Sequence, residues 1–279
     1  MPQTINTNLA SLNAQRNLSM SQGSLATSMQ RLSSGLRVNS AKDDAAGLAI
    51  AERMNAQVRG MNVAMRNAND AISLSQTAEG AIGKIGDALQ RMRELAVQSA
   101  NGSNNEGDRG NLDTEFTELK NEVERLVNGT KFNGTSLFDG TVATFTFQSG
   151  ANTTVGVDTI DIQGTDLTTN VSGAVASLTV GGTDATGAYA AIDAIDTAIS
   201  EVTTSRALYG AAQNRFETVV SNLQVSAENL TAARSRIMDA DFAVETANLS
   251  RAQILQQAGN AMVAQANALP QQVLKLLQG

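Results

Sequence analysis

Asp43 and Asp44 are adjacent carboxylates, and paired carboxylates are one arrangement that could perform acid–base or metal chemistry. Such chemistry needs a cluster of groups, and the chain contains no histidine and no cysteine, which removes imidazole, thiol and most zinc chemistry. Ser40, three positions before Asp43, fits the start of a helix better, with Asp44 near the positive end of that helix. We therefore expect no catalytic, cofactor or metal site and predict that the chain is not an enzyme.

The composition favours thin contacts between helices over a thick globular core. Hydrophobic residues make up 42% of the 279 residues but aromatic residues only 3%, so the apolar surface is mostly aliphatic. Such side chains suit coiled-coil contacts. A net charge of -7 argues against a nucleic-acid partner, which would require a basic stripe.

No segment resembles a membrane helix or a Sec-type signal peptide. A membrane-spanning helix needs roughly 18 or more apolar residues, and no run of that length occurs. The first residues lack a basic cluster followed by an apolar stretch. We expect no membrane insertion, and either a cytoplasmic protein or one that leaves the cell without a cleaved signal.

Both ends of the chain have the apolar spacing of long helices but very few charges. Residues 1–41 contain three arginines as their only ionisable side chains, and after Arg251 the only one is Lys275. Exposed helices normally carry charge on the outer face, so these helices are predicted to be enclosed by other copies of the chain. The apolar positions expected to mediate self-assembly are Ile5, Leu9, Leu12, Leu25, Met29, Leu32 and Leu36 at the start, and Ile254, Ala258, Met262, Leu269, Val273 and Leu276 at the end.

The first half of the middle region is predicted to be helical. One long helix spans residues 58–96, and a second spans 112–126 and closes at Gly129. Glycines inside a helix cost about 1 kcal/mol each relative to alanine, so Gly80, Gly83 and Gly86 indicate close approach of a neighbouring helix.

A small β region and a long heptad pattern follow. Asn133-Gly134 predicts a tight turn, and alternating residues predict short strands near 143–147 and 155–157. Residues 164–187 have the loosest composition and are expected to form an exposed loop. From 192 to 237 the apolar spacing is that of a coiled coil, with Arg206, Gln213 and Arg234 as polar exceptions. Pro270 predicts a kink or restart in the last helix.

The predicted fold is mainly α: a discontinuous, antiparallel coiled-coil bundle in which the N- and C-terminal helices pair, with a small β-hairpin region. We expect an inner terminal domain from residues 1–42 and 239–279 and an outer helical domain from 43–238. The β-hairpin and loop region occupies 130–187 of the outer domain.

The chain resembles bacterial flagellin in long, ordered segments of both halves. The matching segments are 5–8, 31–47, 66–70 and 76–80 in the first half, and 212–217, 235–237 and 253–259 in the second. They leave about 141–187 uncovered, the interval in which flagellins commonly carry large outer domains. The resemblance implies a short-form subunit that polymerises into the helical flagellar filament used for swimming, with the paired ends lining the inner tube.

The resemblance also implies several partners and a location. It implies type III export to the extracellular flagellum, an export chaperone at the C-terminal helix, and contacts with the flagellar cap and hook–filament junction proteins. It further implies recognition of the monomer by Toll-like receptor 5, through positions that correspond to Arg91, Leu95 and Gln98, with Glu115 on the following helix.

Two alternatives remain open at the level of sequence. Another flagellar axial component, such as a hook–filament junction protein, shares helical ends of this kind. A membrane-active translocator could also use amphipathic ends, but these lack the basic polar face and the Trp or Phe that such helices usually carry.

Overall fold

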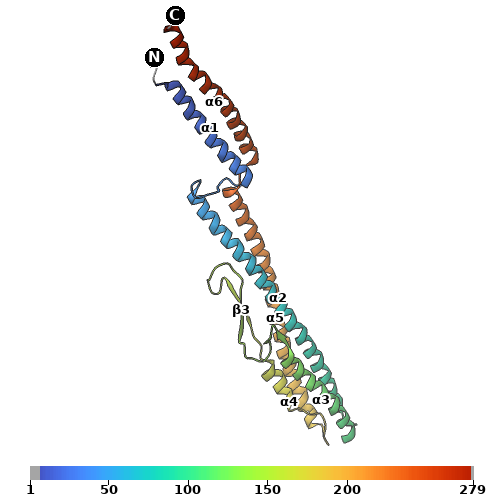
Figure 1. The fold of residues 1–279 in the computed structure, drawn as a ribbon. Helices are drawn as coiled ribbons and strands as arrows, with labels where there is room; N and C mark the ends of the chain where they lie inside the picture. The colour runs from blue at the N-terminus through green and yellow to red at the C-terminus, as the bar shows by residue number, and fades with distance from the viewer. Residues whose placement is uncertain (1–6, 278–279) are drawn as a thin grey trace. The chain divides into compact units, whose positions relative to one another are not determined.

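The computed structural model describes the backbone of residues 7–277 and the side chains of residues 7–268, and the chain divides into two compact units (Figure 1). The terminal unit contains both ends, Met1–Ala56 with Asn229–Gly279, and the middle unit is Gln57–Glu228. The mainly α fold with paired terminal helices is confirmed.

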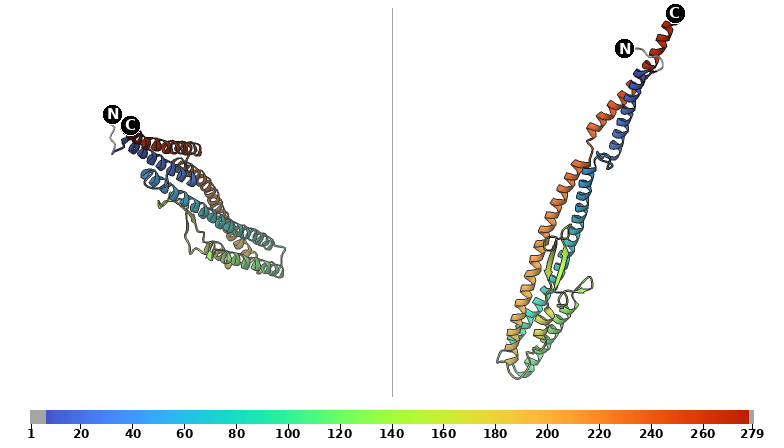
Figure 2. Two further views of the ribbon diagram at one scale, coloured as in Figure 1. Left: turned by 45° about the horizontal axis from the view of Figure 1, so that its top comes forward. Right: turned by 90° about the vertical axis from the view of Figure 1, so that its left-hand side faces the viewer.

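Long helices make up most of both units, and two short hairpins interrupt them (Figure 2). The helices are α1 (Leu9–Ser34), α2 (Ala45–Ser99), α3 (Glu106–Gly129), α4 (Ala174–Ala176), α5 (Thr186–Met238) and α6 (Phe242–Leu277), with the π-helix η1 (Thr168–Gly173) directly before α4. The strands are β1 (Lys131–Phe132), β2 (Thr135–Ser136), β3 (Thr144–Gln148) and β4 (Thr159–Gln163).

Local signals set the helix ends of the terminal unit. Asn8 caps the start of α1, and Gly35, with φ of 71°, closes its end by donating its N–H to the Arg31 carbonyl. The prediction that α2 starts at Ser40 is wrong: Asp43 holds a separate turn over residues 39–43, and Asp44 caps α2 by accepting from the Gly47 N–H at 2.7 Å. The backbone of α6 continues as helix through Pro270, so the predicted restart there is also wrong.

In the middle unit, α2 and α5 run antiparallel and bury most of the core between them. Glu79 of α2 accepts hydrogen bonds from Gln213 at 2.9 Å and Arg206 at 3.3 Å, and further along Arg93 pairs with Asp196 at 2.6 Å. Hydrogen bonds from Gln213 and Arg206 lower the pKa of Glu79. Two of the three predicted polar exceptions in the heptad pattern therefore share one carboxylate, which fixes the register of the two helices.

Substituting Glu79 with alanine is expected to lower the free energy of unfolding of the middle unit by about 1 kcal/mol, because both donors lose their acceptor. Thermal unfolding followed by circular dichroism measures this as a fall in midpoint of roughly 3 °C. Glu201→Ala, which removes an exposed carboxylate from α5, serves as the control. An unchanged midpoint for Glu79→Ala would show that the shared carboxylate does not stabilise the helix pair.

The interior glycines of α2 do not mark close helix contacts within the chain. A Cβ placed on Gly80 or Gly83 would meet no described atom within 4 Å, and on Gly86 it would make an ordinary contact of 3.5 Å with Val202. Gly60 is different, because a Cβ there would lie 2.8 Å from that of Ala151. The close approach to α2 comes from the loop between β3 and β4.

The two hairpins confirm one predicted turn and correct one predicted strand. Asn133 and Gly134, with φ of 48° and 81°, form the tight turn between β1 and β2. The second strand of the larger hairpin is Thr159–Gln163, not the segment around Val155 and Val157, which lies exposed in the loop. Asp158 accepts a hydrogen bond from the backbone N–H of Thr154 and so holds the loop in a turn. Strand β4 therefore begins after Asp158.

The segment 164–187 is also more structured than predicted. It contains η1 and α4, and Val171, Val175 and Val180 are buried in the main core of the middle unit. Asp113 of α3 accepts the backbone N–H of Val180 at 2.7 Å. The segment is polar overall, but its three buried valines pack it against the core.

Candidate functional site

The α1–α6 pair of the terminal unit is built along a line of small and polar side chains. Near one end, Asn8 donates to the Ala266 carbonyl and Ser11 donates to the Asn267 side chain, each at 2.7 Å. In the middle, Gly259 leaves room for Leu18, since a Cβ at that glycine would lie 3.1 Å from the leucine Cδ1. We call this line of contacts the α1–α6 seam.

A charge pair with a buried carboxylate and a half-buried arginine marks the other end of the seam. The carboxylate of Glu245 accepts from Arg31 Nη1 at 2.9 Å and from Ser28 Oγ at 3.1 Å, and the residue is only 5% exposed. Burial raises the pKa of Glu245, but the hydrogen bonds from Arg31 and Ser28 outweigh burial and bring the pKa below its usual value. Glu245 therefore carries its charge at neutral pH.

Next to this charge pair, the backbone ties the start of α6 to the end of α1. Leu36 and Asp239 form an antiparallel bridge, and the Ala240 N–H donates to the Gly35 carbonyl at 2.9 Å. A small core of Val38, Ala51 and Met238 lies beside the bridge. The point at which the two terminal helices come together is thus fixed by residues about 200 positions apart in sequence.

The apolar positions predicted from the sequence divide between half-buried and exposed ones. Leu25, Leu32 and Leu36 are half-buried. In contrast, the following predicted positions are exposed: Leu9, Leu12, Met29, Ile254, Ala258 and Met262. Ile5 lies outside the described residues, and so do the side chains of Leu269, Val273 and Leu276. The role of these positions in self-assembly therefore stays a prediction, because contacts within a single chain do not test it.

The exposed positions leave apolar side chains uncovered on both terminal helices. Leu9 and Ile254 are each 65% exposed and Met262 is 62% exposed. Further large apolar side chains are exposed on the same two helices: Leu12, Met20, Met29, Phe242, Val244 and Leu255. Large apolar side chains that stay exposed on a folded chain are candidates for protein–protein contacts.

The four predicted receptor positions lie together on α2 and α3 of the middle unit. Arg91 bonds Glu115 at 2.8 Å and Glu94 at 2.9 Å, and these hydrogen bonds raise the pKa of Arg91. Arg91, Gln98 and Glu115 are exposed, whereas Leu95 belongs to the core and is only 1% exposed. The two carboxylates thus fix the position of the Arg91 guanidinium on a polar surface, and Leu95 anchors this part of α2 in the core.

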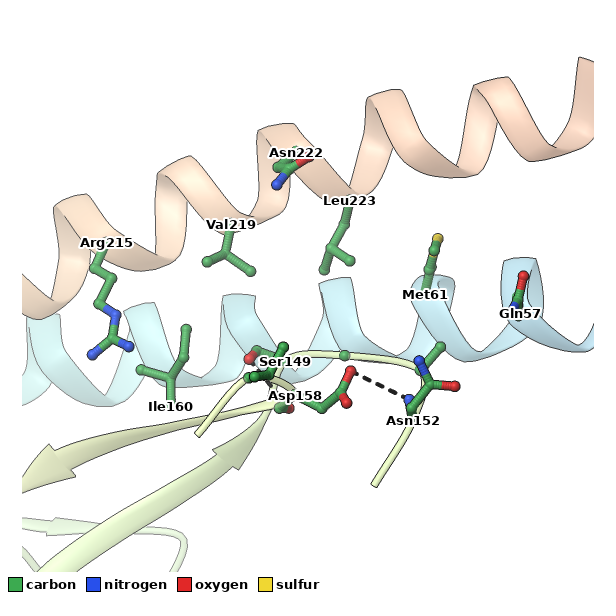
Figure 3. A pocket seen from close by; sticks show the side chains of 13 residues that line it. Gln57, Met61, Ser149, Asn152, Asp158, Ile160, Arg215, Val219, Asn222 and Leu223 are labelled. Atoms are coloured by element: carbon green, nitrogen blue, oxygen red, sulfur yellow. Dashed lines mark hydrogen bonds between the residues drawn. The ribbon is translucent and has the colours of Figure 1, made fainter. Parts of the chain in front are cut away.

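A cavity of about 350 Å³ lies in the middle unit (Figure 3). It lies between α2, α5 and the loop joining β3 to β4, with Arg215 and Asp158 among its lining residues. The Asp158 carboxylate is used by the loop itself, accepting the N–H groups of Asn152 and Thr154. One guanidinium and one loop-holding carboxylate do not form an acid–base pair.

The adjacent carboxylates Asp43 and Asp44 are occupied by the backbone. Asp43 and Asp44 are each used in capping backbone N–H groups. Within residues 7–277, no group of three or more carboxylates could hold a metal ion. Over the same part of the chain, no helix has the length and hydropathy required to cross a membrane.

Comparison with protein families gives two matches that together span most of the chain. The model of the bacterial flagellin N-terminal helical region matches residues 5–143, and that of the C-terminal helical region matches residues 192–277. Residues 144–191, which contain β3, β4 and η1, lie between the two matches.

Curated relatives match over nearly their whole length. A flagellin of Halalkalibacterium halodurans is 48% identical over 274 residues, covering 98% of this chain and 99% of the relative. A flagellin of Bacillus subtilis is 42% identical over 308 residues, with 98% and 99% covered. Flagellin D of Vibrio anguillarum is 36% identical over 376 residues, with 99% and 100% covered, so it carries residues that this chain lacks.

Solved structures share the fold. The crystal structure of Bacillus cereus flagellin superposes with a TM-score of 0.50 at 35% identity, covering 61% of this chain and 94% of that one. A putative flagellar hook-associated protein from Vibrio parahaemolyticus superposes with a TM-score of 0.58 at 16% identity, covering 71% and 100%. At that identity, the second likeness concerns the fold alone.

Proposed function

This chain belongs to the bacterial flagellin family and is a structural subunit of the flagellar filament, and we propose that it polymerises through the outward apolar faces of α1 and α6. The single observation that carries this proposal is the uncovered apolar surface on both terminal helices. Burying such side chains is favourable by roughly 25 cal/mol per Å², and other copies of the chain can supply the covering surface.

In the proposed filament, residues 1–42 and 239–279 form the inner tube and residues 43–238 the outer one. The short segment 130–187 stands where longer flagellins carry outer domains, so the filament is thin and serves swimming. The self-assembly residues are the predicted apolar set, of which Leu9, Leu12, Met29, Ile254 and Met262 are exposed in the single chain.

We further propose that the subunit is secreted by the flagellar type III apparatus and works outside the cell. An export chaperone would cover α6 before assembly, and the cap and hook–filament junction proteins would contact the ends of the filament. These partners would bind the terminal helices, because the apolar side chains of α1 and α6 are accessible only until neighbouring subunits cover them.

Purified chain tests the assembly proposal directly. At rising concentration it should form sedimentable filaments above a threshold, with a helical repeat visible by electron microscopy. A chain that stays monomeric at all concentrations, even with filament fragments as seeds, would reject it. Copy number addresses the alternative, because a filament subunit dominates the protein of sheared filaments whereas a junction protein is rare.

The surface around Arg91 supports a second proposed function, recognition of the monomer by Toll-like receptor 5. Arg91, Gln98 and Glu115 would contact the receptor, while Leu95 would hold α2 in place from the core. Arginine is enriched among residues that dominate binding energy, and here two carboxylates already orient its side chain.

Substituting Arg91 with alanine is therefore expected to weaken receptor activation by the soluble monomer about tenfold or more. A reporter-cell dose response measures this. Arg125→Ala removes another exposed arginine from α3, where it pairs with Glu122, and should leave the response unchanged. Equal potency of Arg91→Ala and the unmodified chain would contradict the assignment.

A further inference from the structure

The sequence contains three Asn-Gly pairs, a dipeptide whose backbone and side chain can react with each other. Glycine has no side chain to shield its backbone nitrogen, so that nitrogen can approach the preceding side-chain amide closely. All three asparagines are exposed, but they differ in what holds the backbone around them. The pairs are Asn101-Gly102 between α2 and α3, Asn128-Gly129 at the end of α3, and Asn133-Gly134 between β1 and β2.

Regular backbone structure hinders the reaction at two of these pairs. Gly129 is the last residue of α3, so its N–H belongs to the hydrogen-bond ladder of the helix. Asn133, with φ of 48°, lies in the two-residue turn that sets the pairing of Phe132 with Thr135. Bringing the glycine nitrogen to the side-chain amide requires rotation about the Cα–C bond of the asparagine. That rotation would break the helix end in one case and the hairpin in the other.

The pair Asn101-Gly102 is arranged for attack on the side chain. Within residues 7–277, the Gly102 N–H donates to no protein acceptor, so its nitrogen is free. The Asn101 Oδ1 accepts the backbone N–H of Ser103 at 3.3 Å, which draws electrons away from the Cγ carbon. No hydrogen bond from the described part of the chain holds the Asn101 Nδ2. Nucleophile, polarised carbon and leaving group therefore lie together in one exposed turn.

A buried arginine lies at the backbone carbonyl of the same asparagine. Arg109 is only 6% exposed, and its guanidinium donates to the Ser99 carbonyl at 3.0 Å and to the Asn101 carbonyl at 3.5 Å. A guanidinium forms its strongest hydrogen bonds with negatively charged oxygens. Arg109 would therefore stabilise a carboxylate formed at this position.

We propose that Asn101 is a site of self-modification, in which the Gly102 nitrogen attacks the Asn101 Cγ and the product is an isoaspartate whose free carboxylate lies beside Arg109. The Gly102 nitrogen loses its proton to solvent and bonds to Cγ, the Cγ–Nδ2 bond breaks, and Nδ2 leaves as ammonia. The resulting cyclic imide contains the Cγ carbonyl and the Asn101 backbone carbonyl. Water adds to the backbone carbonyl carbon, the bond from that carbon to the Gly102 nitrogen breaks, and the carbonyl becomes a carboxylate.

The reaction consumes water, releases ammonia and needs no enzyme or cofactor. It lengthens the main chain by one carbon between α2 and α3 and adds a negative charge there. Because Arg109 already donates to the oxygen that becomes charged, the new carboxylate has a partner inside the turn. The modified fraction increases with time and records the age of the molecule. The inference is independent of filament assembly, since the reacting atoms belong to a single chain.

Peptide mapping of the purified chain tests the proposal, because trypsin places the three pairs in separate peptides, 94–109, 126–131 and 132–206. Incubation in mildly alkaline oxygen-18 water, before digestion in ordinary water, marks the carboxylates formed during the experiment. Mass spectrometry should show Asn101 converting at least about tenfold faster than the other two asparagines in the folded chain, and within about threefold of them in urea. Equal rates in the folded chain would overturn the proposal.

Gly102→Ala tests the nucleophile. A Cβ at Gly102 would meet no described atom within 4 Å, so the turn should be kept while the methyl group hinders the backbone nitrogen. Conversion of Asn101 should fall at least about tenfold. Gly110→Ala, which adds a methyl group at an equally open position of α3, is the matched control and should change the rate less than about twofold. Unchanged conversion in Gly102→Ala would overturn the proposal.

The identity of the product tests the part assigned to Arg109. Isoaspartate and aspartate forms of the peptide 94–109 separate by chromatography, and their ratio at position 101 should be at least about twofold higher in the folded chain than in urea. Arg109→Lys, which offers a single ammonium in place of the planar guanidinium, should lower the ratio toward that of the unfolded chain. A folded-chain ratio equal to that in urea would overturn the placement of the carboxylate beside Arg109.

Discussion

Replacing Leu9, Ile254 and Met262 together with serine is expected to raise the concentration needed for filament growth at least about a hundredfold while the chain stays folded. Each side chain is more than 60% exposed in the single chain, so its loss costs the monomer little. Fully burying such a side chain between copies contributes about 1.5–3 kcal/mol, and a hundredfold change corresponds to about 2.7 kcal/mol. Sedimentation over a concentration series measures the threshold.

The control for this variant must remove apolar surface without touching the terminal helices. Val155 and Val157 are still more exposed, but they lie in the loop between β3 and β4 of the middle unit. Their replacement with serine should shift the threshold by less than about threefold, and both variants should unfold at the temperature of the unmodified chain. Filament growth by the triple variant at the original threshold would exclude α1 and α6 as the assembly surface.

The sequence predicted the long helices and the pairing of the ends because apolar spacing repeats over many turns. It did not predict which faces of α1 and α6 meet. The spacing of large side chains selected Leu9 and Ile254, whereas the hydrogen bonds that join the two helices include those of Glu245 with Ser28 and Arg31. Those partners are more than 200 positions apart, and no local pattern signals that a carboxylate will be buried against them.

The errors in the β region have a different origin. Alternation of apolar residues is equally good around Val155 and around Ile160, so spacing alone could not choose the second strand. The turn determines the position of the second strand. Asp158 accepts hydrogen bonds from the N–H groups of Asn152 and Thr154, so residues up to 158 belong to the turn and strand pairing begins after it. An aspartate following Gly156 was the available local signal, since such residues favour turns.

Arg109 is a further residue whose role the sequence did not indicate. It is buried in α3, and its guanidinium donates to the carbonyls of Ser99 at 3.0 Å, Thr183 at 2.9 Å and Asn101 at 3.5 Å. Backbone carbonyls at the end of a helix lack intrahelical partners, and Ser99 is the last residue of α2. One side chain therefore joins the end of α2, the start of α3 and the segment leading into α5.

Substituting Arg109 with alanine is expected to lower the free energy of unfolding of the middle unit by about 3 kcal/mol, since it removes the arginine donor from the carbonyl of the buried Ser99 and breaks two further hydrogen bonds from a charged group. For a unit of this size the thermal midpoint should fall by roughly 10 °C. Arg125→Ala removes an exposed arginine from the same helix and should change the midpoint by less than about 2 °C. Lysine at position 109 can reach fewer of the carbonyls at once and should restore only part of the loss. If Arg109→Ala and Arg125→Ala unfold at the same temperature, the three carbonyls do not depend on this side chain.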